Sequence, residues 1–390
     1  MIQVSQALSI ISENSCKMPI KKIKVHKSLG FILAETIYSP IDMPPFRQSS
    51  MDGYAFSFSE LNQFDIVGVS QAGNFSNEQI KKNQAIRIFT GAYVPDCLDT
   101  VVMQEHTQRN EQTITIIKKP NALTNVRSKG EQIKKEELVL EKDTLITPAA
   151  IGFLACLGIT EINVYKKPKV AIVVTGNELV KAGKKLGKGK IFESNSVMLK
   201  VALQGVGINK IKTFSVKDNL KNTKKTLQNC LSKFDVVLVS GGISVGDYDF
   251  VKEALLYNGV EELFYTINQK PGKPLFFGKK DKTIVFALPG NPASALSCFY
   301  IYVHLALKKT MGFDSVHLNK IKRKIKTPFQ NTTGKSLFLK GFYNDESVTV
   351  LESQSSAMLN TFATANGLIY MPYNTELVAE NEEVTVIPIN

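Results

Sequence analysis

The sequence predicts a multidomain protein of the α/β-plus-β class. At its centre we expect a doubly wound, mostly parallel α/β domain. A β-rich N-terminal region with a helical linker part precedes it, and a small β-barrel-like domain follows it. Three observations predict this: 390 residues are too many for one ordinary core, strand-like and helix-like patterns alternate through the middle of the chain, and short β-branched runs separated by turn residues occupy both flanks.

The N-terminal region begins with a helical pattern and then turns to strands. Apolar residues at helical spacing predict a helix over Val4–Glu13. Between residues 20 and 140, runs such as FDIVGV, AIRIF and TITIIKK are typical of strands. Thr147 followed by Pro148 is the pattern of an N-cap and a first-turn proline, so we expect a helix that begins there and ends near Gly158.

The central region alternates apolar strands with helices. KVAIVVT, FDVVLVS and TIVFALP are nearly all apolar, as strands of parallel sheets tend to be because both of their faces are covered. One helix is expected at SNSVMLKVALQGVG, capped by Asn195 or Ser196, and a last, strongly apolar helix is expected to start at Asn291 and Pro292. Short strand patterns return towards the C-terminus, with one short helix at 355–365.

Composition argues against several functional classes. The net charge is +13, but only five of the 48 basic residues are arginine and no aromatic-basic motif accompanies the lysines. This favours a Lys-rich solvated surface over a nucleic-acid interface, although a basic field can still attract a small anion. The five cysteines form no CxxC pair and the four histidines no HExxH pair, so neither a disulfide framework nor a zinc site is expected.

No part of the sequence predicts a targeting or membrane segment. The N-terminus lacks a cationic stretch followed by an apolar one, and the longest apolar run, 293–307, is shorter than the ~20 residues that span a bilayer. We therefore expect a cytoplasmic protein that binds neither membrane nor nucleic acid.

Four loops of the central region carry the candidate binding residues. They follow or adjoin predicted strand ends, where open α/β sheets bind their ligands, and glycine lets the backbone approach such a ligand. Strand-to-helix turns need Gly, Pro and Asn in any case, so one loop alone would mean little. The loops form neither a P-loop nor a GxGxxG pattern. The candidates are Thr175, Gly176, Asn177 and Glu178; Ser240, Gly241, Gly242 and Ser244; Lys270 and Lys273; and Pro289, Gly290, Asn291 and Pro292.

Carboxylates near the strand ends add a second signal. Glu178, Asp218 and Asp249 occupy predicted loop positions, and oxygen ligands of this kind, together with substrate phosphates, suit Mg²⁺ better than zinc. Asp247 is more simply explained as a cap of the helix that follows. For Asp249, capping and metal binding are equal alternatives.

Several long segments, spread over nearly the whole chain, carry a family resemblance. They include PPFRQSSMDGYAF, RIFTGAYVPDCLDTVVMQE, NVRSKGEQI, VVTGNELV, FESNSVML, VVLVSGGISVGDYDFVKEAL, KPGKPLFFG and FALPGNPASA. In these segments, taken in the same order, the chain resembles the molybdopterin molybdotransferase family, the group of bacterial MoeA and the C-terminal domain of gephyrin. The match weakens towards the C-terminus, where only SQSSAML and ANGLIYMP look familiar.

The resemblance implies an enzyme of molybdenum-cofactor synthesis. Its reaction would take adenylylated molybdopterin and molybdate, with Mg²⁺, and release AMP. The subunit would have four parts and form a homodimer with the active site near the dimer interface. The four parts would be a linker with helical and β segments (1–44 and 137–166), a β-rich domain (45–136), an α/β molybdopterin-binding domain (167–315) and a C-terminal β domain (316–390).

The resemblance also assigns roles residue by residue. Catalytic positions match Asp52, Thr90, Arg127, Glu178, Asp218, Asp249, Lys270 and Lys273. Of these, Glu178, Asp218 and Asp249 would hold Mg²⁺, and the remaining loop residues named above would bind substrate. The chain departs from the family pattern at Gln132, where an Asp is usual, and at Arg47-Gln48, where an acid–amide pair is usual.

The motifs leave other functions open. The α/β segment by itself would also suit an enzyme that adenylylates molybdopterin or hydrolyses a nucleotide pyrophosphate, and the flanking domains favour the transferase. A gephyrin-like scaffold that binds receptor or cytoskeletal segments is the alternative from another class, disfavoured because no linker or extra domain is present. The choice between molybdenum and tungsten stays open.

Overall fold

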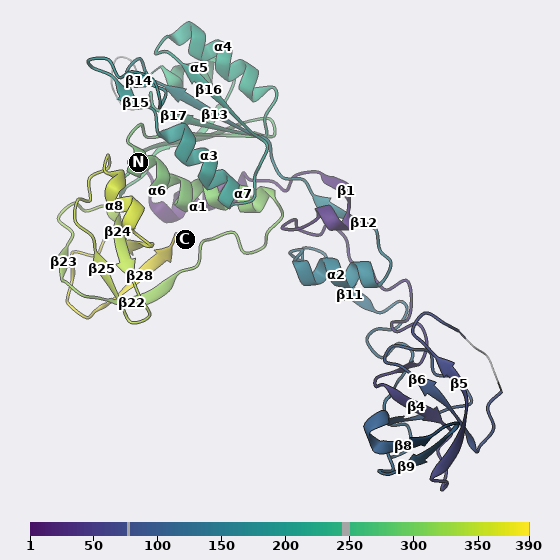
Figure 1. Ribbon diagram of the computed structural model, residues 1–390. Helices are drawn as coiled ribbons and strands as arrows, with labels where there is room; N and C mark the ends of the chain where they lie inside the picture. The colour runs from purple at the N-terminus through teal and green to yellow at the C-terminus, as the bar shows by residue number, and fades with distance from the viewer. Residues whose placement is uncertain (76–78, 244–249, 390) are drawn as a thin grey trace. The chain divides into compact units, whose positions relative to one another are not determined.

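The computed structural model describes residues 1–75, 79–243 and 250–389, which form two compact units. Unit 1 consists of Met1–Lys21, Gly30–Ile32 and Val164–Asn390, and unit 2 consists of Lys22–Leu29 and Leu33–Asn163. The chain therefore starts in unit 1, forms nearly all of unit 2 from one continuous stretch, and then completes unit 1, as the colours along the ribbon in Figure 1 show.

Unit 2 is built on a six-stranded β-sheet in the order β7-β4-β6-β5-β9-β8. All neighbours are antiparallel except β5 and β6. Tyr54 and Phe56 enter one apolar cluster and Ala55 the other, because successive residues of a strand face opposite sides. The strands are β4 (Gly53–Phe56), β5 (Gln63–Ser70), β6 (Gln84–Ile88), β7 (Thr100–Met103), β8 (Thr107–Asn110) and β9 (Thr113–Ile116).

A helix and several short strand pairs complete this part of the chain. Helix α2 (Pro148–Cys156) begins as the sequence predicts, because the Thr147 side chain accepts a hydrogen bond from the Ala150 amide at 3.2 Å. Gly158, with φ +75°, follows its end. The pairs are β1 (Ile20–Lys24) with β12 (Glu161–Tyr165), β2 (Ile37–Tyr38) with β11 (Leu138–Leu140), and β3 (Gln48–Ser49) with β10 (Val126–Arg127), beside the 3₁₀ turns Val25–Lys27 and Gln104–His106.

The α/β part of unit 1 contains a six-stranded sheet in the order β16-β13-β17-β21-β20-β18. The first four strands are parallel, as predicted, whereas β20 and β18 form an antiparallel edge that the sequence patterns did not reveal. The strands are β13 (Val170–Thr175), β16 (Ile211–Val216), β17 (Val236–Ser240), β18 (Glu261–Thr266), β20 (Pro274–Lys280) and β21 (Thr283–Leu288), with the short pair β14 (Leu179–Val180) and β15 (Ile191–Phe192) outside the sheet.

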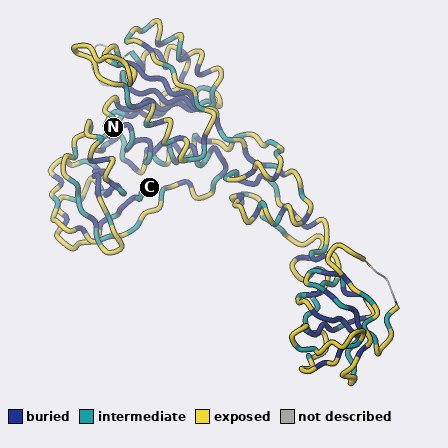
Figure 2. The backbone as a smooth tube through the Cα atoms, in the orientation of Figure 1, coloured by how far each residue is buried: buried dark blue, intermediate teal, exposed yellow. Residues whose placement is uncertain are grey.

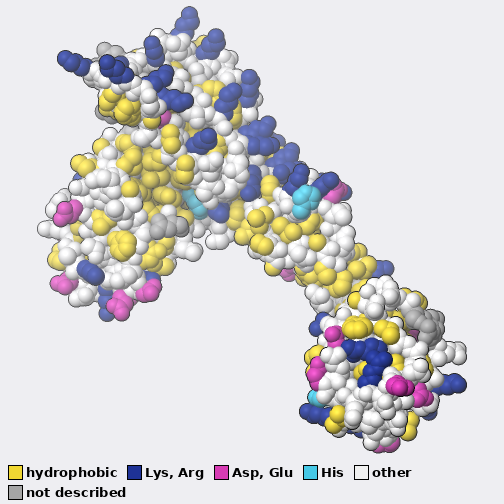
Figure 3. Space-filling view, viewed as in Figure 1, with side chains coloured by type: hydrophobic (Ala, Val, Ile, Leu, Met, Phe, Trp, Pro, Cys, Tyr) yellow, Lys and Arg dark blue, Asp and Glu magenta, His cyan; other side chains and the backbone are white. Residues whose placement is uncertain are grey.

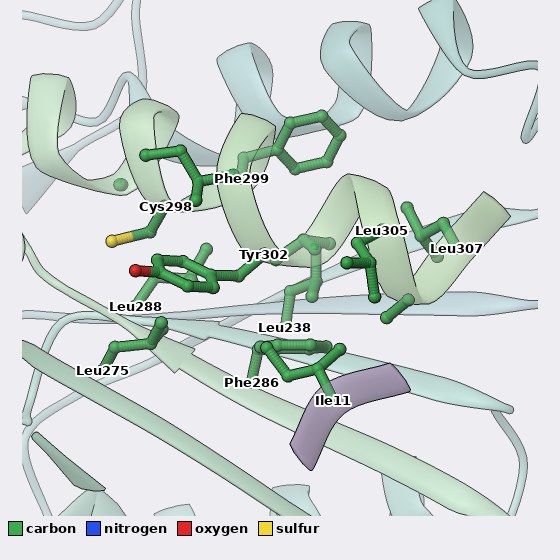
Figure 4. Packing of buried hydrophobic residues seen from close by; sticks show 14 of the residues in the cluster. Ile11, Leu238, Leu275, Phe286, Leu288, Cys298, Phe299, Tyr302, Leu305 and Leu307 are labelled. Atoms are coloured by element: carbon green, nitrogen blue, oxygen red, sulfur yellow. The ribbon is translucent and has the colours of Figure 1, made fainter. Parts of the chain in front are cut away.

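Helices cover both faces of this sheet, which confirms the doubly wound fold (Figure 1). One core joins Ile172 of β13 to α1, α3, α6 and α7, and the other joins Val173 to α4 and α5. Figure 4 shows part of the first core, in which the Tyr302 side chain lies between its helix and Leu288 and Leu275 of the sheet. The helices are α1 (Val4–Glu13), α3 (Asn195–Gly205), α4 (Leu220–Leu231), α5 (Val251–Tyr257), α6 (Pro292–Cys298) and α7 (His304–Thr310).

Two helix predictions need correction. Helix α3 is capped at Ser194, neither at Asn195 nor at Ser196, because the Glu193 carboxylate accepts the Ser196 amide at 2.7 Å and so supplies the cap from outside the helix. The last apolar helix is not one α-helix, since a π-helical turn, Phe299–Val303, separates α6 from α7.

The C-terminal strands of unit 1 form a closed barrel, which confirms the predicted barrel-like domain. Its order is β24-β25-β22-β28-β26, and β26 pairs with β24 to close the ring, which removes the exposed edges. Its interior is buried, as Figure 2 shows in dark blue. The barrel strands are β22 (Ile321–Ile325), β24 (Ser336–Tyr343), β25 (Ser347–Val350), β26 (Gly367–Met371) and β28 (Glu383–Pro388). The other elements of this part are β19 (Gln269–Lys270), which pairs with β24, the pair β23 (Phe329–Gln330) and β27 (Leu377–Val378), and helix α8 (Leu359–Thr364).

None of the helices within residues 1–75, 79–243 and 250–389 has the length and apolarity needed to cross a bilayer.

Candidate active site

A pocket of about 720 Å³ opens at the carboxyl ends of β13, β17 and β21 in unit 1. Strands of a parallel sheet end at the same edge, so the loops that follow them converge there, as the sequence predicts. The predicted residues that line this pocket are Thr175, Gly176, Glu178, Asp218, Ser240, Gly241, Gly242, Pro289, Gly290, Asn291 and Pro292.

Two glycines let the loop after β17 lie against the end of β13. Gly241 and Gly242 have φ of +92° and +66°, a left-handed conformation that other residues adopt at a cost. A Cβ atom on Gly241 would lie 2.8 Å from the Thr175 carbonyl oxygen, and one on Gly242 would lie 2.7 Å from Val251 Cγ2. The wall of the pocket therefore requires glycine at both positions.

Asn177 holds Asp218 at the rim of the pocket. The Asn177 amide donates to Asp218 Oδ2 at 3.0 Å, and the Asp218 amide donates back to Asn177 Oδ1 at 3.2 Å. Asn177 itself does not line the pocket. Its role in this structure is to join two loops and so keep the Asp218 and Glu178 side chains on the same rim.

Asn195 and Glu193 are among the lining residues that the sequence did not predict as site residues. Asn195 Nδ2 donates to Ser240 Oγ at 2.7 Å and to the Gly290 carbonyl at 2.8 Å, so it ties two of the predicted loops together. Glu193 adds a third carboxylate to the lining. The segment FESNSVML contains both residues, but helix patterning suggested only a cap for Asn195.

Lys270 and Lys273 lie outside the pocket lining. Both are exposed: Lys270 ends β19, and Lys273 lies in the turn that leads directly to Pro274, which does line the pocket. Gly272 packs so closely on α6 that a Cβ atom there would lie 2.6 Å from Cys298 Sγ. The two lysines are therefore held beside the pocket by a rigid turn.

In unit 2, the structure brings Asp52 and Thr90 together. Asp52 Oδ1 accepts hydrogen bonds from the Thr90 amide and hydroxyl, both at 2.8 Å. The backbone bond, then the hydroxyl bond, and also the charge of Arg87 hold the pKa of Asp52 below its usual value. The pair forms an exposed, ionised carboxylate.

Arg127 lies in a different hollow of unit 2. This pocket of about 170 Å³ is lined by Arg127, Gln48, Gln132 and neighbouring residues, so both departures from the family pattern touch it. Arg47, the other member of one departure, donates through Nη2 to the Leu98 carbonyl at 2.6 Å. Arg47 thus has a structural task in holding the loop after β6.

Three loop residues that the sequence singled out, Ser244, Asp247 and Asp249, lie outside the described residues. Within the described ranges no group of three or more His, Cys, Asp and Glu side chains is arranged to hold a metal ion. Of the predicted Mg²⁺ ligands, the structure thus brings Glu178 and Asp218 to one pocket.

A doubly wound sheet with an acid-lined pocket at its carboxyl edge, accompanied by a β-rich region and a closed barrel, defines a multidomain α/β protein that handles a small ligand. Known families match the same parts. Residues 171–309 match a probable molybdopterin binding domain, residues 2–158 the MoeA N-terminal region (domain I and II), and residues 322–389 the MoeA C-terminal region (domain IV).

Individual relatives agree with these matches. A molybdopterin molybdenumtransferase of Haemophilus influenzae is 35% identical and the match covers 94% of this chain and 93% of that protein. One from Staphylococcus epidermidis is 33% identical over 99% of this chain and 95% of its own. A crystal structure of the MoeA protein from Pyrococcus horikoshii superposes with a TM-score of 0.85 at 28% identity, covering 100% and 99% of the two chains. The chain belongs to the MoeA family of molybdopterin molybdenumtransferases.

Proposed function

We propose that this protein is a molybdopterin molybdenumtransferase, which inserts molybdate into adenylylated molybdopterin, releases AMP and yields molybdenum cofactor. The observation that carries the proposal is the pocket at the carboxyl edge of the sheet, in the region that matches a molybdopterin binding domain. Its loops supply hydroxyl, amide and backbone groups that suit a polar heterocycle with phosphates.

The residues around the pocket suit the cleavage of a phosphoanhydride. Gly241 and Gly242 allow a ligand to approach the backbone closely. Lys270 and Lys273, held beside Pro274, would neutralise the phosphate oxygens and the molybdate dianion. As the bond between the two phosphates breaks, negative charge grows on the departing AMP, and fixed cations stabilise that charge.

The pocket fits Mg²⁺ as a cofactor. Its described lining contains three carboxylates, Glu178, Glu193 and Asp218, and no lysine or arginine, although its proposed ligand is a polyanion. Mg²⁺ is usually held by one or two carboxylates together with substrate phosphates and water. Glu178 and Asp218 would hold the ion, since Glu193 is already engaged by Ser196. The bound ion would neutralise the phosphate oxygens.

We also propose a cytoplasmic homodimer. Helix α2 contains no charged residue, yet Pro148, Ala149 and Ala155 are exposed, and an apolar helix of this kind usually packs against a partner. The free cysteines suit a reducing compartment. Light scattering should show a dimer, and Ala155→Glu should shift it to monomer. Ala72→Glu, in an exposed turn of the same unit, should leave it unchanged. A monomeric wild type would refute this assignment.

Release of AMP from adenylylated molybdopterin tests the function. With Mg²⁺ present, release should depend on molybdate, and the product should reconstitute a molybdenum-dependent apoenzyme. Asp218→Asn and Glu178→Gln should each lower kcat/KM about tenfold or more, because each removes a carboxylate that would hold the Mg²⁺. Asp345→Asn, on the barrel surface, is the matched control. Consumption of ATP with metal-free molybdopterin, in place of AMP release, would instead identify an adenylylating enzyme.

A further inference from the structure

A lysine-rich arm borders the pocket. It consists of β14, β15 and the loop 181–190 between them, KAGKKLGKGK, and all ten loop residues are exposed. The loop contains five lysines and no acidic residue. Figure 3 shows dark-blue side chains projecting at the end of the molecule where β14 and β15 lie in Figure 1.

Both ends of the arm are fixed at the rim of the pocket. Leu179 pairs with Ile191, and both residues line the pocket. Lys190 Nζ donates to the Asn177 carbonyl at 2.7 Å, and the Ile191 amide donates to the Glu178 carbonyl at 3.0 Å. These bonds hold both ends of the loop at the pocket, while its ten residues are exposed to solvent.

The arm carries the charge that the pocket lacks. The described pocket lining has three carboxylates and no basic side chain. None of the ion pairs among the described residues involves a lysine of the arm. A run of like charges is often only a solvated surface. Here, however, the loop that carries these five lysines starts and ends beside an acidic pocket that has to admit a polyanion.

The arm also presents an aromatic ring to the pocket. Phe192 lines the pocket, is 47% exposed, and takes part in no ring–ring contact among the described residues. The neighbouring Ile191, which also lines the pocket, is 56% exposed, so two adjacent large apolar side chains are open to a ligand at the pocket mouth. A planar heterocycle is the ligand that stacks best on such a ring.

We propose that the arm, residues 179–192, captures the phosphorylated substrate: its lysines hold the phosphate groups and Phe192 stacks on a planar heterocycle. The inference rests on the proposed function, which supplies a ligand with both features. The heterocycle is either the pterin or the adenine of adenylylated molybdopterin, and the test below distinguishes them. Electrostatic capture of this kind raises the local concentration of an anionic ligand at the site.

Calorimetric titration of the whole protein tests the charge. The variant Lys184→Gln/Lys185→Gln/Lys188→Gln should bind ADP and metal-free molybdopterin about tenfold more weakly at low ionic strength, with the difference lost at high salt because exposed charges are screened. The matched control, Lys322→Gln/Lys324→Gln/Lys326→Gln, removes equally exposed lysines from the barrel and should behave as wild type. Equal affinities and equal salt dependence in all three proteins would overturn the inference.

The variant Phe192→Leu tests the ring. It should weaken one of the two ligands about tenfold without changing the salt dependence, and Phe192→Tyr should restore the affinity. Loss for ADP alone identifies adenine as the stacked ring, and loss for molybdopterin alone identifies the pterin. No loss for either would overturn the stacking role.

The capture role and the transferase function can fail separately. Absence of molybdate-dependent AMP release from the wild type, with ADP binding that still weakens in the arm variant, would reject the function and retain capture. Normal AMP release together with an arm variant whose KM for adenylylated molybdopterin is unchanged at low salt would reject capture alone. If capture is correct, the arm variant raises KM and leaves kcat near wild type.

Discussion

At the residue scale, two hydrogen bonds from Thr90 are the largest causes of the lowered pKa of Asp52, a candidate catalytic group. Both donors to Asp52 Oδ1 come from Thr90, and they hold the pKa of Asp52 below its ordinary value of 3.8. Because the pKa is lower in the folded state, these bonds stabilise the fold above pH 3.8 and lose their effect as the pH falls through the folded value.

The variant Thr90→Ala should raise the pKa of Asp52 only part of the way to 3.8, because the backbone amide, the larger cause, remains. Carbon-detected NMR titration of the Asp52 carboxyl measures this directly. The variant Thr107→Ala, whose hydroxyl bonds to the Gln104 carbonyl in the same unit, should leave the Asp52 pKa unchanged. An unaltered pKa in Thr90→Ala would show that the hydroxyl bond is absent in solution.

Gln269 and Tyr302 form a buried polar pair beneath the lysine turn. The Tyr302 hydroxyl, seen beside the Cys298 sulfur in Figure 4, donates to Gln269 Oε1, and Gln269 Nε2 donates to the Gly272 carbonyl at 2.9 Å. Burial raises the pKa of Tyr302 well above its usual range, so the hydroxyl keeps its proton and remains a donor. Every polar atom of Gln269 that faces the core is thus satisfied.

The variants Tyr302→Phe and Gln269→Leu should each lower the free energy of unfolding by about 1–3 kcal/mol, because each leaves a buried polar group without its hydrogen-bond partner. Because both remove the same bond, the double variant should lose less than the sum of the two. Urea unfolding gives the values, and Tyr300→Phe, whose hydroxyl has no partner within the described residues, is the control. Strict additivity would contradict the pairing.

At the scale of elements, Thr147 and Pro148 correctly predict where helix α2 begins. Thr147 supplies the capping oxygen and Pro148 needs no hydrogen-bond acceptor for its nitrogen. Thr147→Ala should destabilise unit 2 by about 1 kcal/mol, as loss of an N-cap does, and Thr147→Ser should restore most of it. A fall in the thermal midpoint for Ala but not for Ser is the expected result; equal falls would show that the hydroxyl is not the cap.

Other elements could not be read from local pattern. The antiparallel strands β18 and β20 complete a sheet whose other members are parallel, and their pairing partners are set by tertiary packing. The π-helical turn at Phe299–Val303 also has no simple sequence signal. The turn contains Tyr302, whose hydroxyl donates to Gln269, 33 residues earlier in the sequence. A long-range contact therefore coincides with this irregular turn.

At the scale of the whole molecule, two units have separate cores. Phe64 is buried in unit 2 and Phe286 in unit 1. Replacement of either by Ala should cost about 3–5 kcal/mol, because a large buried ring leaves a cavity. Scanning calorimetry should resolve two transitions, with Phe64→Ala lowering one and Phe286→Ala the other. A single transition that moves with both variants would show that the units unfold together.

The sequence by itself determined the class of fold, the main helices and strands, the family and most of the loops that form the pocket. It could do so because hydrophobic period, caps and glycine turns are local signals, and because loops after parallel strands meet at one edge. The sequence alone therefore predicts Thr175, Ser240 and Pro289 as pocket residues, and all three line the pocket.

Only the tertiary structure decided how those loops are held and charged. The bonds from Asn195 to Ser240 and Gly290 depend on contacts between distant segments. So do the exclusion of Lys270 and Lys273 from the lining and the anchoring of the lysine arm beside an acidic pocket. Such contacts arise when separate elements pack, and no local pattern records which residues will meet.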